Sequence, residues 1–147
     1  MAKRVFARAA RRPVATPPEL ADRIEALLAR RCCDLLGLAR RAGSAVAGFD
    51  RVGEALRRHE AALLLFALDG AEGGQRRLGG IGREAALATA LYGGELGAVF
   101  GRDRVVHAMV RPGRLSDRLR GDLRRLAGFR PAATVEWRQD GGIGTND

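Results

Sequence analysis

The chain has 147 residues, 46% of them hydrophobic, which excludes a disordered tail and suffices for one domain with a core that needs no disulfide or metal. It carries 26 basic and 17 acidic residues, a formal net charge of +9, and this excess of base points to a polyanionic partner, most commonly nucleic acid. A genome rich in G and C explains why all basic residues but Lys3 are arginines, yet it does not explain the charge excess.

The two cysteines, Cys32 and Cys33, are adjacent, and neighbours on a helix point about 100° apart, which disfavours a disulfide between them. The sequence has no CxxC motif and no Cys/His cluster, so it predicts neither a metal site nor a cofactor. The longest clear apolar run, residues 61–68, is too short to cross a bilayer. We therefore expect a cytoplasmic protein that does not enter a membrane.

The chain begins with a basic arm, residues 1–18, which carries a helix start signal at its end. In the motif TPPE, residues 16–19, threonine suits the cap, proline suits the first helical position, and glutamate completes a capping box. The helix is expected to run to about Ala42, and Gly43 is placed to end it.

The apolar positions of this helix are spaced by three and four residues, as in an amphipathic helix. They are Leu20, Ile24, Leu27, Leu28, Leu35, Leu38 and Ala42. Arg31 falls in the middle of the stripe, so we expect a bend near residues 30–33, or two helices end to end. Residues 19–32 would then be a linking helix ahead of the main domain, residues 33–130.

Beyond Gly43, helices and strands are expected to alternate. The predicted strands are residues 44–47, 61–68, 86–92 and 104–110, and the predicted helices are residues 50–58, 72–81, 95–100 and 112–127. The run AALLLFAL, residues 61–68, is typical of a central strand buried on both faces, whereas the alanines of 86–92 make a helix almost equally acceptable. Residues 131–147 are expected to be a flexible tail, in which Val135 and Trp137 could add an edge strand. The alternation predicts an α/β domain with helices on both faces of the sheet.

Catalytic motifs are absent: the sequence contains no GxSxG, HExxH, GxxxxGK[ST] or GxGxxG pattern. His107 lies in a predicted strand and is expected to be a core or edge residue. Asp69 and Glu72 follow the central strand and are expected to cap the next helix. We therefore predict no enzyme, with a small enzyme acting on a nucleotide through Asp69, Glu72 or His107 as the weaker alternative.

The stretch RRAGSAVAGFDRV, residues 40–52, combines features suited to an RNA phosphate backbone. Arg40 and Arg41 end one helix just before a loop at Gly48, where a glycine lets a backbone approach closely. The next helix begins there, and a helix N-terminus presents unpaired N–H groups and partial positive charge. Asp50 can cap that helix, and Arg51 in its first turn can reach a phosphate or a guanine edge. Aromatic residues for base stacking are few, which favours folded RNA over single strands.

Residues 35–56, LLGLARRAGSAVAGFDRVGEAL, resemble the start of the kink-turn RNA-binding ribosomal-protein family, and most closely its bacterial YlxQ-like branch. The resemblance continues through ALLLFALDGAE, residues 62–72, and ELGAVFGRDRVVHAMV, residues 95–110. FARAARRPV, residues 6–14, resembles the tail of a YlxR-like domain, so the basic arm is consistent with a remnant of such a preceding domain.

The resemblance implies a three-layer α/β/α sandwich with a mixed four-stranded sheet, here with an N-terminal helical extension, and an RNA-binding domain over residues 33–130. Family members bind RNA through a Gly-Asn-Glu turn and a loop before the last strand. Gly48 matches the glycine, whereas Asp50 stands for the asparagine, Arg51 for the glutamate, and Glu54 for a common lysine. The expected RNA-binding residues are Arg40, Arg41, Gly48, Asp50, Arg51, Arg102 and Arg104. The alternative is a protein-interaction module whose arm and first helix dock a ribosomal or transcription protein without RNA contact.

Overall fold

A computed structural model describes residues 17–70 and 73–136, which form an α/β domain. The elements, in chain order, are α2 (Pro18–Arg41), β1 (Ala45–Ala47), α3 (Phe49–Arg58), β2 (Leu63–Phe66), α4 (Gly73–Ile81), β3 (Ala86–Thr89), α5 (Gly93–Phe100), β4 (His107–Val110), α6 (Arg114–Ala127) and β5 (Thr134–Glu136). The alternation expected from the sequence is confirmed, and the ambiguous alanine-rich segment is the strand β3.

The sheet is mixed and has the strand order β1-β4-β2-β3-β5. The pair β2–β3 is parallel, and the other three pairs are antiparallel. The four predicted strands are present, and β5 adds a fifth at the edge next to β3. Val135 pairs with Ala88 in that strand, so part of the segment predicted as a tail belongs to the sheet. Trp137 lies outside the described residues.

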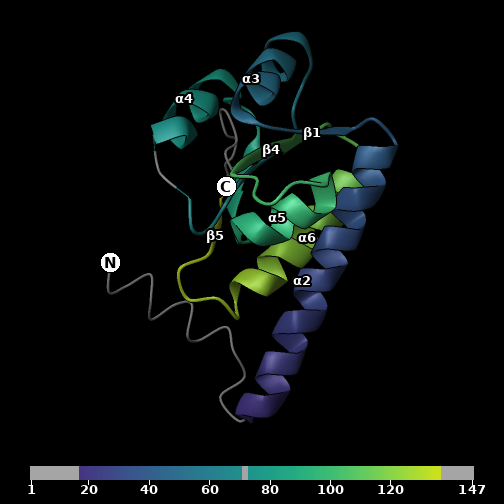
Figure 1. The fold of residues 1–147 in the computed structure, drawn as a ribbon, viewed down its shortest axis with the longest axis vertical. Helices are drawn as coiled ribbons and strands as arrows, with labels where there is room; N and C mark the ends of the chain where they lie inside the picture. The colour runs from purple at the N-terminus through teal and green to yellow at the C-terminus, as the bar shows by residue number, and fades with distance from the viewer. Residues whose placement is uncertain (1–16, 71–72, 137–147) are drawn as a thin grey trace, which may run out of the picture.

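Helices cover both faces of the sheet and make three layers, with α2, α5 and α6 on one face and α3 and α4 on the other (Figure 1). The central strand β2 is buried on both faces, because Leu63 and Leu65 pack into the core under α2 and α6 whereas Leu64 and Phe66 pack into the core under α3 and α4. This arrangement confirms the layered α/β class and the central position of the AALLLFAL run.

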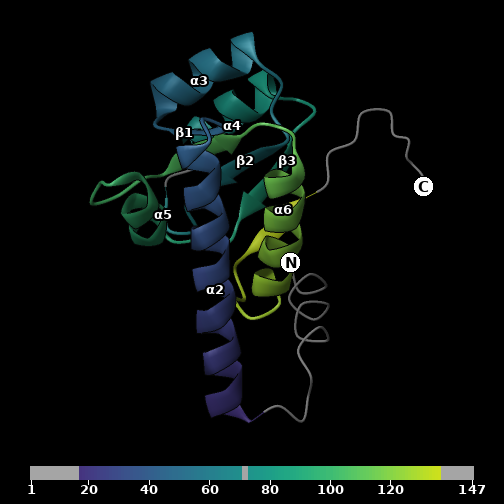
Figure 2. The ribbon, with the colours of Figure 1, turned by 90° about the vertical axis from the view of Figure 1, so that its right-hand side faces the viewer.

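Helix α2 is one uninterrupted helix, so the expected bend or break at residues 30–33 is wrong. Arg31 does not need to leave the helix, because its Nε lies 3.4 Å from Oδ2 of Asp122, a buried carboxylate on α6. The half-exposed Arg31 side chain thus reaches from the helix surface to pair with a carboxylate that is buried in the α2–α6 interface. Figure 2 shows the N-terminal end of α2 extending beyond the other elements.

The apolar stripe predicted for α2 is only partly right. Leu20, Leu27 and Leu38 are 45%, 60% and 45% exposed. The positions that are buried lie on a neighbouring face of the helix: Ala21, Leu28, Ala29, Cys32, Leu35, Leu36 and Ala39. Small residues on this face let α2 pack closely on α6 and α5, which leaves three leucines outside the core.

A buried arginine after α6 joins the N-terminal and C-terminal parts of the domain. The Arg130 guanidinium donates to both carboxylate oxygens of Glu95 at 2.8 and 2.9 Å, to Glu25 at 2.9 Å and to the Ala90 carbonyl at 2.8 Å. It also lies 4.6 Å from the centre of the Tyr92 ring. These contacts hold α2, the start of α5 and the segment after α6 together, and so they fix the position of α5 next to the end of α2.

Candidate functional site

Gly43 ends α2 as predicted and directs the chain into β1. Its φ is +78°, and the N–H groups of Gly43 and Ser44 donate to the carbonyls of Arg40 and Ala39 at 3.0 and 2.8 Å. This pair of bonds is the Schellman motif, in which a left-handed residue satisfies the last carbonyls of a helix. The motif sets Arg40 at the end of α2, one short strand away from the next turn.

Gly48 forms that turn and opens α3. Its φ of +101° is one that side chains rarely tolerate, its N–H donates to the His107 carbonyl at 2.9 Å, and its own carbonyl accepts from Val52 at 2.8 Å. Gly48 is therefore the N-cap residue, and the expectation that Asp50 caps this helix is wrong: Asp50 is exposed within the first turn.

Arg40 connects the end of α2 with the end of α5. Its Nη1 donates to the Val99 carbonyl at 3.2 Å, and its guanidinium carbon lies 6.0 Å from the centre of the Phe100 ring. An arginine near a helix C-terminus interacts favourably with the exposed carbonyls there. The contact places Arg40 beside the loop 101–104 that follows α5.

The loop 101–104 lies against the Gly48 turn. Gly101 ends α5 with a φ of +70°, and a Cβ at Gly48 would lie 3.4 Å from Nη1 of Arg102, so the Arg102 side chain covers the turn. The loop also packs tightly on α5, because a Cβ at Gly97 would lie only 2.5 Å from the Arg102 carbonyl oxygen. The two segments that the sequence analysis placed in one site are thus adjacent.

Arg104 points to a different partner. Its Nη1 donates to Oδ2 of Asp69 at 3.0 Å, and its Nη2 donates to the Asp69 carbonyl at 2.6 Å. Oδ1 of the same aspartate accepts from the Gly93 N–H at 2.8 Å, and this bond, together with Arg104, lowers the pKa of Asp69. Asp69 therefore caps the start of α5, and it pairs with Arg104 at the surface, where both side chains are about half exposed. The expectation that Asp69 caps the next helix involves residues 71 and 72, which lie outside the described residues, and stays a prediction.

The remaining predicted residues lie at the margin of the turn. Arg51 is exposed in the first turn of α3. The Arg41 side chain extends back along α2, where its Nη1 would lie 3.7 Å from a Cβ added at Gly37. We use the name Gly48 surface for the area formed by Arg40, Gly48, Arg51 and Arg102. Arg41 lies beside this surface, and Arg104 forms an ion pair with Asp69.

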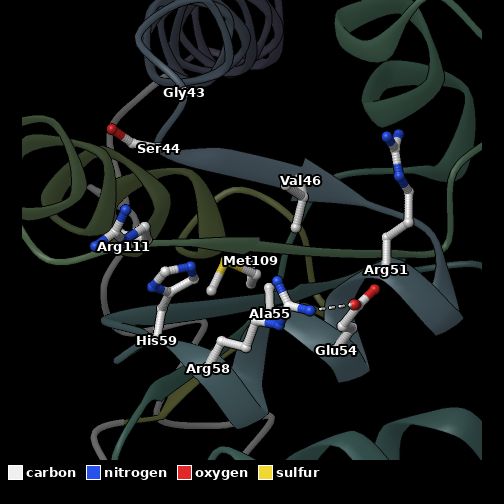
Figure 3. Close-up of a pocket in the computed structure, with 10 residues that line it drawn as sticks. All are labelled: Gly43, Ser44, Val46, Arg51, Glu54, Ala55, Arg58, His59, Met109 and Arg111. Carbon is white, nitrogen blue, oxygen red and sulfur yellow. Dashed lines mark ion pairs between the residues drawn. The ribbon is translucent and has the colours of Figure 1, made fainter.

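A groove that the sequence analysis missed lies between α3 and the β1–β4 edge of the sheet (Figure 3). Val46, Ala55 and Met109 line its floor, and several arginines stand around it. Glu54, which would repel phosphate if unpaired, lies 3.2 Å from the guanidinium of Arg58. The lining combines the neighbouring elements β1 and α3 with β4, which lies about 50 positions later, and only the pairing of Val46 with Met109 on adjacent strands could have indicated it.

Two side chains considered for catalysis have structural roles, since Asp69 is paired with Arg104 and His107 is buried. His107 is 8% exposed, as expected for a core residue, and lies between Phe49 and Phe66, with ring centres 5.5 and 6.1 Å away. Burial lowers the pKa of His107. Burial likewise raises the pKa of Cys32 to about 12 and that of Cys33 to about 11, so neither thiol is an activated nucleophile. Glu72 lies outside the described residues.

Among residues 17–70 and 73–136, no helix is long and apolar enough to cross a membrane, and no three His, Cys, Asp or Glu side chains gather as metal ligands do. No model of a protein family matches the chain, and no curated protein matches it. A solved structure described as a protein with unknown function from Bacillus halodurans C is similar, with a TM-score of 0.56 and 21% identity over 63% of this chain and 95% of that one. At this identity the likeness shows a shared α/β fold.

Proposed function

We propose that the protein binds folded RNA through the Gly48 surface, as a member of the bacterial YlxQ-like branch of the kink-turn RNA-binding ribosomal-protein family. The observation that carries the proposal is the position of Arg102, whose guanidinium lies against the positive-φ turn that opens α3. A cation, a helix N-terminus and a glycine that admits a close backbone meet at this point. The excess of base over acid in the chain is consistent with a polyanionic ligand.

Binding at this surface would rest mainly on phosphate neutralisation. Arg40 and Arg102 supply charge on either side of the turn, and Arg51 adds a third guanidinium that can pair with a phosphate or with the O6 and N7 edge of guanine. Asp50 and Arg51 replace the amide and carboxylate of the family's Gly-Asn-Glu turn. We therefore expect this protein to favour folded RNA without the usual preference for a standard kink-turn.

The test compares Arg40→Gln/Arg102→Gln with a control that removes the same charge elsewhere, Arg118→Gln/Arg124→Gln on the exposed face of α6. Affinity for a kink-turn RNA and for a plain hairpin is measured by fluorescence anisotropy between 50 and 300 mM salt, with heparin as competitor. Two lost phosphate contacts should lower the slope of log K against log salt by about 1.4 to 1.8, and the control should change it little. Equal slopes and affinities for the two variants would show that this surface is not the RNA site.

A protein-interaction module is the second candidate, and the exposed leucines of α2 favour it. Leu20 and Leu27 lie in the N-terminal half of α2, at 45% and 60% exposure. The N-terminal end of this helix extends beyond the other elements (Figure 2). In this case the helix would dock a ribosomal or transcription protein. Capture of such a partner that survives nuclease treatment and is lost in Leu20→Gln/Leu27→Gln would favour this candidate over direct RNA contact.

A further inference from the structure

We propose that the groove between α3 and the β1–β4 edge receives one unstacked nucleotide of the bound RNA, a proposal that rests on the RNA binding proposed above. The groove contains the two components that such a nucleotide requires, an apolar floor for the base and cations for its phosphates. Folded RNA commonly presents such nucleotides in bulges and loops, where the base is free to leave the helix.

The floor is apolar and comes from three elements, with Val46 from β1, Met109 from β4 and Ala55 from α3 (Figure 3). The volume of the groove is about 250 Å³. Pockets for drug-sized ligands measure about 300 to 1,000 Å³, so this groove suits a single ring system. Ala55 has the smallest side chain of the three floor residues, so a larger side chain at this position would take up part of the groove.

The rim is cationic, with Arg51 and Arg58 on α3 and Arg111 just after β4. Arg58 is paired with Glu54, whereas Arg51 and Arg111 are exposed and make no ion pair with another described residue. A guanidinium can bind a phosphate through two parallel hydrogen bonds and can also lie flat on a base. This net positive rim favours a phosphodiester over a peptide.

Arg51 connects the groove with the proposed RNA-binding surface, which favours a nucleotide within an RNA strand over a free nucleotide. It stands in the first turn of α3, three positions after Gly48, and it lines the groove as well as the Gly48 surface. The groove is therefore continuous with the proposed RNA face. A strand bound over the Gly48 turn could place its next unpaired nucleotide in the groove and leave the following phosphate near Arg111.

Met109 provides a direct reporter of the floor, because the chain has two methionines, Met1 and Met109. Protein labelled with ¹³C at the methionine methyl groups is titrated with a hairpin carrying one unpaired uridine, with the same stem fully paired, and with uridine monophosphate. The bulged hairpin should shift the Met109 methyl signal, and the paired stem should bind without shifting it. Binding of the bulged hairpin with an unchanged Met109 signal would overturn the groove proposal alone, whereas absence of all RNA binding would overturn the proposed function as well.

Two variants test separately the contribution of the base and that of its phosphate to binding. Ala55→Leu should fill the groove and abolish the selective gain for the bulged hairpin while affinity for the paired stem is retained. Arg111→Gln should weaken the bulged hairpin by about fivefold, the equivalent of one exposed ion pair, and the control Arg118→Gln should not. A shift of Met109 by uridine monophosphate at the concentration at which the hairpin acts would assign the groove to a free nucleotide and overturn the proposal, as would full selectivity in a folded Ala55→Leu protein.

Discussion

Replacement of Arg130 by methionine should destabilise the domain strongly, since the guanidinium is 6% exposed and neutralises two carboxylates. Methionine preserves much of the aliphatic volume but leaves Glu95 and Glu25 without their cation. Loss of one partner from a buried ion pair costs about 3 to 5 kcal/mol. Because Glu25 and Glu95 are themselves 30% and 29% exposed and water can relieve part of their charge, we expect about 3 kcal/mol, the lower end of that range.

The assay is urea unfolding at neutral pH, with Arg124→Met, an exposed position on α6, as the matched control. A loss of about 3 kcal/mol in the free energy of unfolding corresponds to a decrease of roughly 9 °C in melting temperature for a chain of this size. The control should have a free energy of unfolding within about 0.5 kcal/mol of the wild type. A loss below about 1 kcal/mol in the Arg130 variant would refute the reasoning.

The pH dependence of the same variant provides an independent check. Burial by itself would raise the pKa of Glu95, but hydrogen bonds from Arg130 and from the Tyr92 N–H outweigh it and lower the pKa. The stability that Glu95 contributes is therefore present above its unfolded pKa and is lost as the pH falls through the folded value. The difference in stability between wild type and Arg130→Met should narrow as the pH falls below the unfolded pKa of Glu95, about 4.3, and through its lower folded value; a difference that stays constant would contradict this account.

Three further predictions concern the loop, the imidazole and the thiols. Gly97→Ala would place a Cβ 2.5 Å from the Arg102 carbonyl oxygen, so we expect a loss of about 2 kcal/mol in urea unfolding together with weaker RNA binding; an unchanged stability would refute the tight packing of the loop. Because burial lowers the pKa of His107, stability should be fully present above about pH 6.5 and decline as the pH falls through the folded value; His107→Leu should abolish this decline, and an identical melting profile in the variant would assign it to another group. The raised pKa of Cys32 should protect its thiol from Ellman's reagent in the native protein at pH 8, and fast labelling without denaturant would contradict its burial.

Most of the fold followed from local patterns. The alternation of apolar runs with turn residues predicted every strand and helix from β1 to α6, because period and turn chemistry are properties of short segments. The predictions of a helix break and of the buried face of α2 were wrong because α6, which lies far along the chain, determines both. The sequence predicts a break at Arg31, whereas Asp122 on α6 pairs with this side chain and the helix continues. The burial of the alanine-rich face in place of Leu27 depends on how closely α6 approaches α2.

The candidate site was predictable where backbone geometry determines it. Gly43 and Gly48 were identified from sequence, since few other residues suit a left-handed helix end or a positive-φ turn. The ion pair of Arg104 could not be predicted, because its partner Asp69 lies 35 positions earlier and no local signal connects them. The groove was missed for the same reason: its floor exists only after β4 pairs with β1.

The contact of Arg130 with Glu25 spans 105 positions, and this separation affects how the chain can fold during synthesis. A ribosome that adds about 5 to 20 residues per second needs roughly 5 to 20 s to make that stretch. During this interval α2 already exists, whereas α6, the surface that buries its alanine and leucine face, does not. The first helix must therefore remain without α6 until nearly the whole domain has been made, and a chain interrupted before residue 114 would expose the apolar face of this amphipathic helix, which favours aggregation.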